Sequence, residues 1–66
     1  MKAGDIYKYK YDFLFIKLLR EGSDFMGIKK WEIEVIDGNQ SLIKYFESKI
    51  GESLLESTIL NLFDIF

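Results

Sequence analysis

One segment of the chain, residues 30–48, sets the strongest constraint on how the chain can fold. Within it Trp31, Ile33 and Val35 alternate with two glutamates, which is the period of a strand with one buried face. The apolar members are aromatic or β-branched, as a half-buried pleated surface prefers. We therefore predict a strand here, with the only tryptophan of the chain in the core.

The strongest turn signal follows this strand, at Asp37-Gly38-Asn39. Gly and Asn tolerate the positive φ that tight turns need. A three-residue turn followed by a return strand over residues 42–50 sets apolar residues opposite apolar ones and joins opposite charges, which stabilises a hairpin. This interpretation, which we favour, predicts the cross-strand pairs Ile33–Ile43, Trp31–Tyr45, Glu32–Lys44 and Lys29–Glu47.

The sequence leaves a second interpretation of residues 42–50 open. These residues also fit a helix that ends at Gly51, because glycine readily adopts the left-handed conformation that terminates helices. The apolar face of that helix would comprise Leu42, Ile43, Phe46 and Ile50.

The first third of the chain is typical of strand. From Tyr7 onward aromatic residues occupy the odd-numbered positions and lysines the even-numbered ones, but from Leu14 onward apolar residues occupy both kinds of position. One straight strand cannot change face in this way, so we expect a bend, bulge or tight turn near residues 10–13. We expect either one long bent strand or two strands, over about residues 5–9 and 13–20.

Glycines mark the breaks between the remaining elements. Residues 20–24 form a polar loop that contains Gly22, a turn signal. Gly27 is a candidate bulge just before the tryptophan strand, and Gly51 marks a break before the C-terminal segment.

The C-terminal segment begins with a helix-capping pattern. Ser53 is followed three residues later by Glu56, the spacing of a capping box. Beyond it apolar residues recur at helical spacing. We favour a helix over residues 54–65, and a terminal strand over residues 58–65 is the alternative. The apolar face of the helix would comprise Leu55, Ile59, Leu62, Phe63 and Phe66.

Over roughly residues 4–47 the pattern resembles the small SH3-like barrels: an opening GDIYKYK, a bent apolar strand, a polar loop, a tryptophan-bearing strand and a hairpin. The fold we expect is a single α+β domain over residues 1–66. It is a small antiparallel SH3-like barrel or curled sheet of about four to five strands with a C-terminal helix. Such folds host many unrelated functions, so the resemblance assigns no functional residues. The expected core comprises Ile6, Phe15, Leu18, Trp31, Ile33, Val35, Ile43, Leu55, Ile59 and Phe63.

Composition limits the chemistry available to the chain. It contains no cysteine and no histidine, so neither a disulfide nor an ordinary zinc site can form. A chain of 66 residues is near the lower limit for independent folding, so apolar packing or oligomerisation must stabilise it. Hydrophobic residues make up 48% and aromatic residues 17%, a surplus that indicates a dense core or an apolar patch for a partner.

We expect no enzymatic activity, no catalytic residue, no metal ligand and no cofactor. Without His or Cys a general base would have to be a carboxylate, a Lys or a Tyr. Glu32 and Glu34 lie about 6–7 Å apart by strand rise, a spacing that suits a hard cation. A solvated strand face near Lys29 and Lys44 explains these two glutamates more simply.

A single-stranded nucleic-acid-binding protein is the alternative function. Tyr7, Tyr9 and Tyr11 alternate with Lys8 and Lys10, the ingredients of a base-stacking platform. In a strand, however, the tyrosines and the lysines point to opposite faces. The net charge of −2 also opposes a phosphate partner.

We predict a non-enzymatic protein-interaction module that binds a protein partner, itself, or both, as a homodimer or larger assembly. Tyrosine and phenylalanine anchor interfaces, and exposed edge strands pair with copies of themselves. Charge is also uneven: residues 1–30 carry seven basic and four acidic groups, and residues 31–66 carry two and seven. The expected binding residues are Tyr7, Lys8, Tyr9, Lys10, Tyr11, Phe13 and Phe66.

The sequence also suggests an origin and a location. The N-terminus lacks the apolar region of a secretory signal, and the apolar segment at residues 13–19 is too short to span a bilayer. Frequent Lys, Ile and Phe are typical of a complete small gene from an AT-rich genome. We expect a cytoplasmic viral or mobile-element factor that inhibits or modulates a host protein, with no membrane partner.

Overall fold

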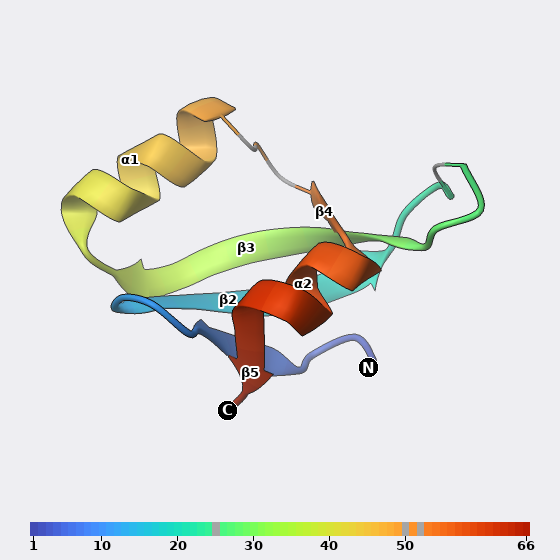
Figure 1. The fold of residues 1–66 in the computed structure, drawn as a ribbon, viewed down its shortest axis with the longest axis horizontal. Coiled ribbons are helices and arrows are strands. Elements are labelled where there is room, and N and C mark those ends of the chain that lie inside the picture. Colours follow the sequence, from blue (N-terminus) through green and yellow to red (C-terminus); the bar gives the residue numbers. More distant parts are fainter. Residues whose placement is uncertain (25, 50, 52) are drawn as a thin grey trace.

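The computed structural model describes residues 1–24, 26–49, 51 and 53–66. Within these residues the chain forms five strands and two helices (Figure 1), which confirms the predicted α+β class. Neither of these helices is long and apolar enough to cross a membrane. The elements in chain order are β1 (Ile6–Tyr9), β2 (Leu14–Glu21), β3 (Lys30–Gly38), α1 (Gln40–Lys49), β4 (Ser53–Leu55), α2 (Glu56–Leu62) and β5 (Phe63–Ile65).

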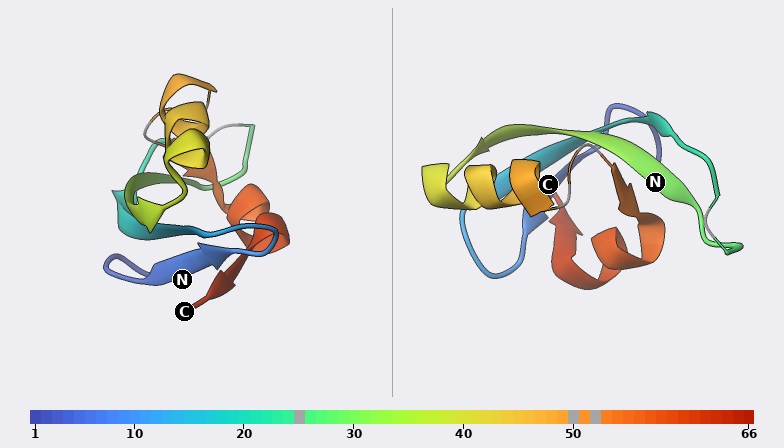
Figure 2. Two further views of the ribbon diagram at one scale, coloured as in Figure 1. Left: turned by 90° about the vertical axis from the view of Figure 1, so that its left-hand side faces the viewer. Right: turned by 90° about the horizontal axis from the view of Figure 1, so that it is seen from above.

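The strands form one antiparallel sheet in the order β4-β3-β2-β1-β5, which curls into a half-barrel. The chain passes from β4 at one edge through α2 to β5 at the opposite edge, so α2 bridges the open side of the curl (Figure 2). The half-barrel therefore has a concave face, which holds the core and is covered by helices, and a convex outer face.

The predicted break in the N-terminal apolar segment is confirmed. β1 and β2 are two strands of an antiparallel hairpin with Tyr7 opposite Ile16, joined by the turn at residues 10–13. Tyr7 is buried in β1, whereas Leu14 and Ile16 are buried in β2. An odd-numbered residue faces the core in β1, whereas even-numbered residues face it in β2. The turn therefore changes which residues point to the concave face, and this accounts for the change in the sequence pattern.

Residues 40–49 form a helix, so the favoured return strand and its four cross-strand pairs were wrong. β3 ends at Gly38, and the carbonyl of Asn39 accepts the N–H of Ile43 at 2.9 Å as the first helical hydrogen bond. Phe46 is buried against the sheet. The N–H of Gly51, at φ 80°, donates to the carbonyl of Phe46, as the helical alternative predicted; Ile50 lies outside the described residues.

Residues 40–49 form a helix and not a strand because of where they lie relative to the core, beside the edge of β3. A hairpin strand would have kept the apolar side chains of residues 42–46 within the sheet. As a helix, the same residues place Leu42, Ile43 and Phe46 together on the end of the core. The helix therefore buries Phe46 and half-buries Leu42 and Ile43 while it satisfies its own backbone hydrogen bonds.

The predicted capping box does not form. Ser53 lies in β4 instead, and α2 starts at Glu56, with Leu55 at its N-cap and no side-chain cap. The Glu56 carboxylate instead accepts the indole N–H of Trp31 at 3.0 Å. Both C-terminal interpretations were partly right, because a seven-residue helix leads directly into the short strand β5.

Gly27, predicted as a bulge, lies instead in the loop before β3, with φ 79°. The bulges of the sheet occur elsewhere, between β2 and β3.

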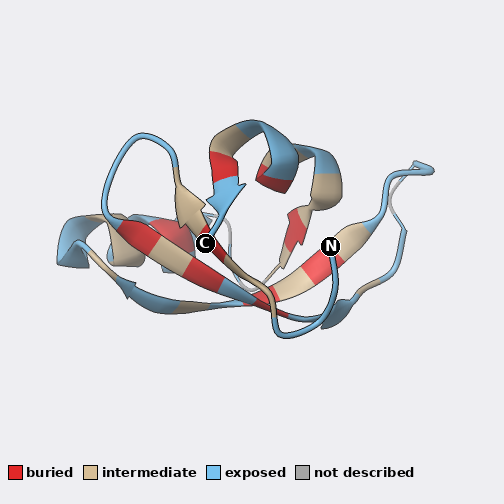
Figure 3. Ribbon diagram, turned by 90° about the horizontal axis from the view of Figure 1, so that it is seen from below, coloured by how far each residue is buried: buried red, intermediate tan, exposed pale blue. Residues whose placement is uncertain are grey.

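The core lies on the concave face (Figure 3). Of the predicted core residues, Leu18, Trp31, Ile33, Ile59 and Phe63 are buried, and Val35 and Ile43 pack against the core. Ile6, Phe15 and Leu55 are only half-buried, so their assignment to the core was wrong. The predicted core did not include the buried residues Tyr7, Leu14, Ile16, Phe46 and Leu54.

Trp31 to Ala should lower the free energy of unfolding by about 3–5 kcal/mol, because the change removes a buried aromatic side chain and leaves a cavity. Urea denaturation measures this value. Leu60, an exposed apolar residue of α2, provides the control: Leu60→Ala should change stability by less than about 0.5 kcal/mol. Similar losses in the two variants would contradict the central position of Trp31.

Gly38 to Ala should destabilise the fold by about 1–3 kcal/mol, because Gly38 has φ 150° and a Cβ there would lie 2.8 Å from the carbonyl oxygen of Phe13. Thermal or urea unfolding measures the loss. At Gly22 a Cβ would come no closer than 3.5 Å to the atoms around it, so Gly22→Ala is the matched control and should be nearly neutral.

Candidate functional site

The convex face of the sheet carries side chains that the core does not use. In β2, alternate residues Leu14, Ile16 and Leu18 are buried, so Phe15 and Lys17 point outward. The register places Lys8 of β1 opposite Phe15. Because β2 is apolar on both parities, the sheet presents apolar side chains to solvent as well as to the core.

A β-bulge adds a further apolar residue to this face. Phe15 pairs with Asp37 and Ile16 pairs with Val35, so Ile36 is the extra residue on β3. Ile36 is exposed and lines a shallow hollow of about 340 Å³ together with Ile6, Phe15, Asp37 and Phe66.

Three phenylalanine rings form a connected group on the convex face. The ring centroids of Phe13 and Phe15 lie 5.7 Å apart, and those of Phe15 and Phe66 lie 5.0 Å apart, both edge-to-face, a favourable arrangement for aromatic pairs. Phe13 nevertheless remains 46% exposed and Phe66 79% exposed. We call the surface formed by Ile6, Phe13, Phe15, Ile36 and Phe66 the convex patch.

Charged residues of both signs surround the convex patch. Lys17 is paired with Ile6 on one side and with Glu34 on the other, and Lys8 lies between Phe15 and Asp64 in the sheet. The apolar centre with a mixed polar rim has the composition of a protein interface.

The structure distributes the predicted tyrosines over different environments. Tyr7 is buried in the core. Tyr9 is half-buried and packs against the rings of Phe63 and Phe46, with centroids 5.3 Å and 6.5 Å away. Tyr11, in the turn after β1, is 70% exposed and contacts Tyr9 edge-on. The three rings therefore do not share one exposed face.

The predicted lysines are engaged by neighbouring oxygen atoms. The Lys8 ammonium donates to the carbonyl of Tyr9 at 3.0 Å, and the Lys10 ammonium lies 4.0 Å from the Asp64 carboxylate. Of the predicted binding residues, Phe13 and Phe66 are brought together by Phe15 into one patch, and Lys8 lies beside Phe15 at its rim. The three tyrosines do not belong to this patch.

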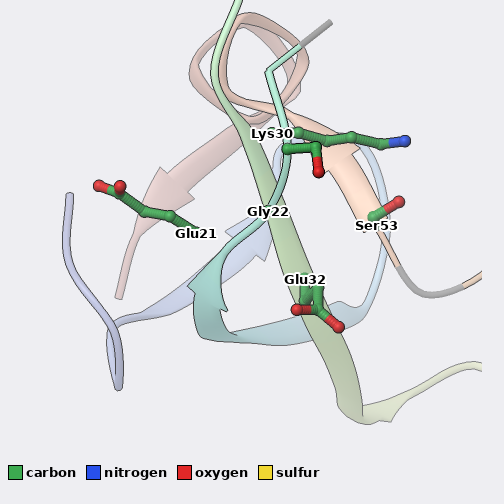
Figure 4. A pocket seen from close by; sticks show the side chains of 6 residues that line it. Glu21, Gly22, Lys30, Glu32 and Ser53 are labelled. Atoms are coloured by element: carbon green, nitrogen blue, oxygen red, sulfur yellow. The ribbon is translucent and has the colours of Figure 1, made fainter.

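A second, polar hollow lies between the end of β2 and β4 (Figure 4). Figure 4 shows the Glu21 and Lys30 side chains pointing in opposite directions. Glu21 lies 3.0 Å from the Lys29 ammonium, so its carboxylate is neutralised from outside the hollow. The side chains that line this hollow do not converge on a common point.

Glu32 and Glu34, the carboxylates with the spacing for a hard cation, also have cationic neighbours. Glu32 forms a two-point ion pair with the guanidinium of Arg20, one contact being Nη2 to Oε1 at 3.0 Å. Glu34 lies opposite Lys17 across the sheet. Within the described residues, no three acidic side chains come close enough to hold a metal ion together.

Sequence reasoning missed one member of the convex patch and placed two others in the core. Ile36 reaches the patch through a bulge, which leaves no local signal. Ile6 and Phe15 were assigned to the core because an apolar residue in a strand is more often buried. The signal that could have revealed an apolar outer face was that both odd- and even-numbered residues of β2 are apolar.

Comparison of the chain with protein-family models, curated proteins and solved structures gives no significant match.

Stability should fall at alkaline pH, in part through Tyr7. Burial raises the pKa of the Tyr7 phenol above its ordinary value of 10.0, and the charges of Asp5 and Glu56 raise it further. Because the folded state disfavours the ionised phenol, this contribution to stability is complete below pH 10 and is lost as the pH rises toward the folded-state pKa.

The slope of unfolding free energy against pH above pH 10 measures this effect. Tyr7→Phe removes the ionisable group and should make the slope shallower than in the unmodified chain. An unchanged slope in Tyr7→Phe would show that the phenol is not desolvated.

Proposed function

We propose that this chain is a non-enzymatic protein-interaction module and that the convex patch is its contact surface, occupied by an apolar surface of a partner protein. One observation carries the proposal: Phe66 remains largely exposed and Phe13 about half exposed, although both rings contact the ring of Phe15. A small chain gains stability by burying aromatic rings, so rings that are ordered yet exposed suit binding better than folding.

The geometry of the patch supports binding in two further ways. Its central ring, Phe15, stands on the middle strand β2 and contacts the rings of Phe13, in the preceding turn, and Phe66, directly after β5. Phe15 therefore loses little conformational freedom on binding. The surrounding charges, such as Lys17 and Glu34, can select a partner by complementarity, since rim charges mainly govern specificity and association rate.

The finer features of the proposal rest on the sequence. The antiparallel, curled sheet supports an SH3-like arrangement, which we include in the proposal. A viral or mobile-element origin, the modulation of a host protein and a cytoplasmic location stay predictions from size and composition.

Site-specific photo-crosslinking would identify the partner. A photoreactive phenylalanine analogue at position 66 should capture the protein that covers the convex patch, and the same analogue at position 60, an exposed site on α2, is the matched control. The captured protein is then purified for titration calorimetry with the unmodified chain.

Phe66→Asp and Phe13→Asp should each weaken that binding about tenfold or more, because truncating an anchor residue of an interface typically costs about 2 kcal/mol. Leu60→Asp introduces the same charge outside the patch and should leave the affinity within about twofold.

Equal losses in all three variants would show that charge, and not the patch, controls binding. Capture of an oligonucleotide whose binding falls steeply with added salt, and is abolished by Lys8→Glu and Lys10→Glu, would instead support the nucleic-acid alternative.

A further inference from the structure

β5 is an edge strand with an open outer side. It ends the strand order and, among the residues that the structure describes, pairs only with β1. Edge strands of this kind are templates for pairing with another chain, and proteins usually protect them with charges or proline. β5 carries one charge, on Asp64, but Ile65 is apolar and 63% exposed, and the apolar Phe66 lies next to it.

The hydrogen bonds to β1 show which backbone groups of β5 face outward. The N–H of Phe66 donates to the carbonyl of Ile6, and the carbonyl of Leu62 accepts the N–H of Lys10, each at 2.9 Å. Residues alternate in an antiparallel ladder, so Asp64 also faces β1. Ile65 therefore directs both its N–H and its carbonyl to the open side.

Phe63, the other outward-facing residue of β5, has already used its donor. Its N–H bonds to the carbonyl of Ile59 as the C-cap of α2. The open edge thus offers one complete donor–acceptor pair, on Ile65.

We propose that this edge pairs with the same edge of a second copy of the chain, antiparallel and about a two-fold axis at Ile65. In that arrangement each Ile65 donates to and accepts from the partner's Ile65, so a single donor–acceptor residue is self-complementary. The two-fold arrangement also brings two exposed isoleucine side chains together.

The charges of β5 select this register over the adjacent one. A two-fold axis at Asp64 would set two carboxylates directly opposite each other, which is destabilising, and would require the N–H of Phe63. With the axis at Ile65, Asp64 lies opposite the partner's Phe66. The Asp64 carboxylate also keeps its neighbour Lys10, 4.0 Å away.

The dimer extends the convex face across two sheets. Phe66 belongs to the convex patch and lies next to the two-fold axis, so pairing brings two patches to one continuous outer surface. The inference shares Phe66 with the proposed function, but the dimer does not require that the convex patch binds a partner protein. Because the ladder is short, we expect a weak dimer, with a dissociation constant of about 10–1000 μM.

Light scattering over a concentration series tests the proposal, with Ile65→Pro as the decisive variant. Proline removes only the outward N–H of residue 65 and leaves the hydrogen bonds of Asp64 and Phe66 to β1 intact. We expect the unmodified chain to approach twice the monomer mass and Ile65→Pro to raise the dissociation constant at least about tenfold. Ile65→Val, which keeps the N–H and the β-branch, should dimerise like the unmodified chain.

Amide hydrogen exchange on the same samples locates the contact. The Ile65 amide should become more protected as concentration rises, and circular dichroism confirms that Ile65→Pro remains folded. If Ile65→Pro does not fold, Ile65→Lys, which places a charge on the edge, replaces it with the same expectation.

A chain that stays monomeric up to millimolar concentration overturns the inference, and cross-linking of a different protein at position 66 would then still support the proposed function. A dimer that survives Ile65→Pro but is lost in Phe66→Asp would also overturn the inference, because it would show contact through the convex patch. The two proposals therefore fail separately.

Discussion

The burial of Trp31 is the interaction on which the rest of this fold depends. Its side chain lies on the concave face of the longest strand, and its indole N–H reaches the Glu56 carboxylate at the start of α2. The backbone of Trp31 also pairs with Leu54 in β4. One residue thus ties together the strand that carries the core, the edge strand β4 and the helix that closes the half-barrel. This matters in a chain that has no disulfide to hold its ends.

The apolar character of both faces of β2 links stability to function. Its even residues, Leu14 to Leu18, fill the core, while Phe15 points outward and holds Phe13 and Phe66 on the convex face. A strand with a polar outer face would have been sufficient to fold the chain. The second apolar face therefore needs an explanation outside the core, and interaction with another protein surface provides one.

Much of the strand structure could be predicted from local patterns. The tryptophan strand and the two N-terminal strands follow from period-two alternation and from a parity change that a straight strand cannot produce. Residues 42–49 could not be assigned in this way, because Leu42, Ile43 and Phe46 satisfy both strand pairing and helical spacing. Their conformation depends on where the end of the core lies, and this is a property of the assembled sheet.

The candidate site was predictable only in part, because its members meet through register. Phe13 and Phe66 were predicted as binding residues, but they are far apart in sequence and are joined by Phe15, whose outward orientation depends on β2 packing. Ile36 enters through a bulge that no local signal marks. The Ser53 to Glu56 spacing predicted a cap, yet Glu56 binds the Trp31 indole, since pairing with β3 draws Ser53 into a strand.

By itself the sequence determined the α+β class, the dependence on apolar packing, and the burial of Trp31, because composition and alternation act locally and need no knowledge of distant neighbours. Only the tertiary structure decided which face Phe15 occupies, that residues 40–49 are helical, and that Ile65 lies on an open edge. These outcomes depend on strand order and register, which arise when segments distant in the chain compete for one core.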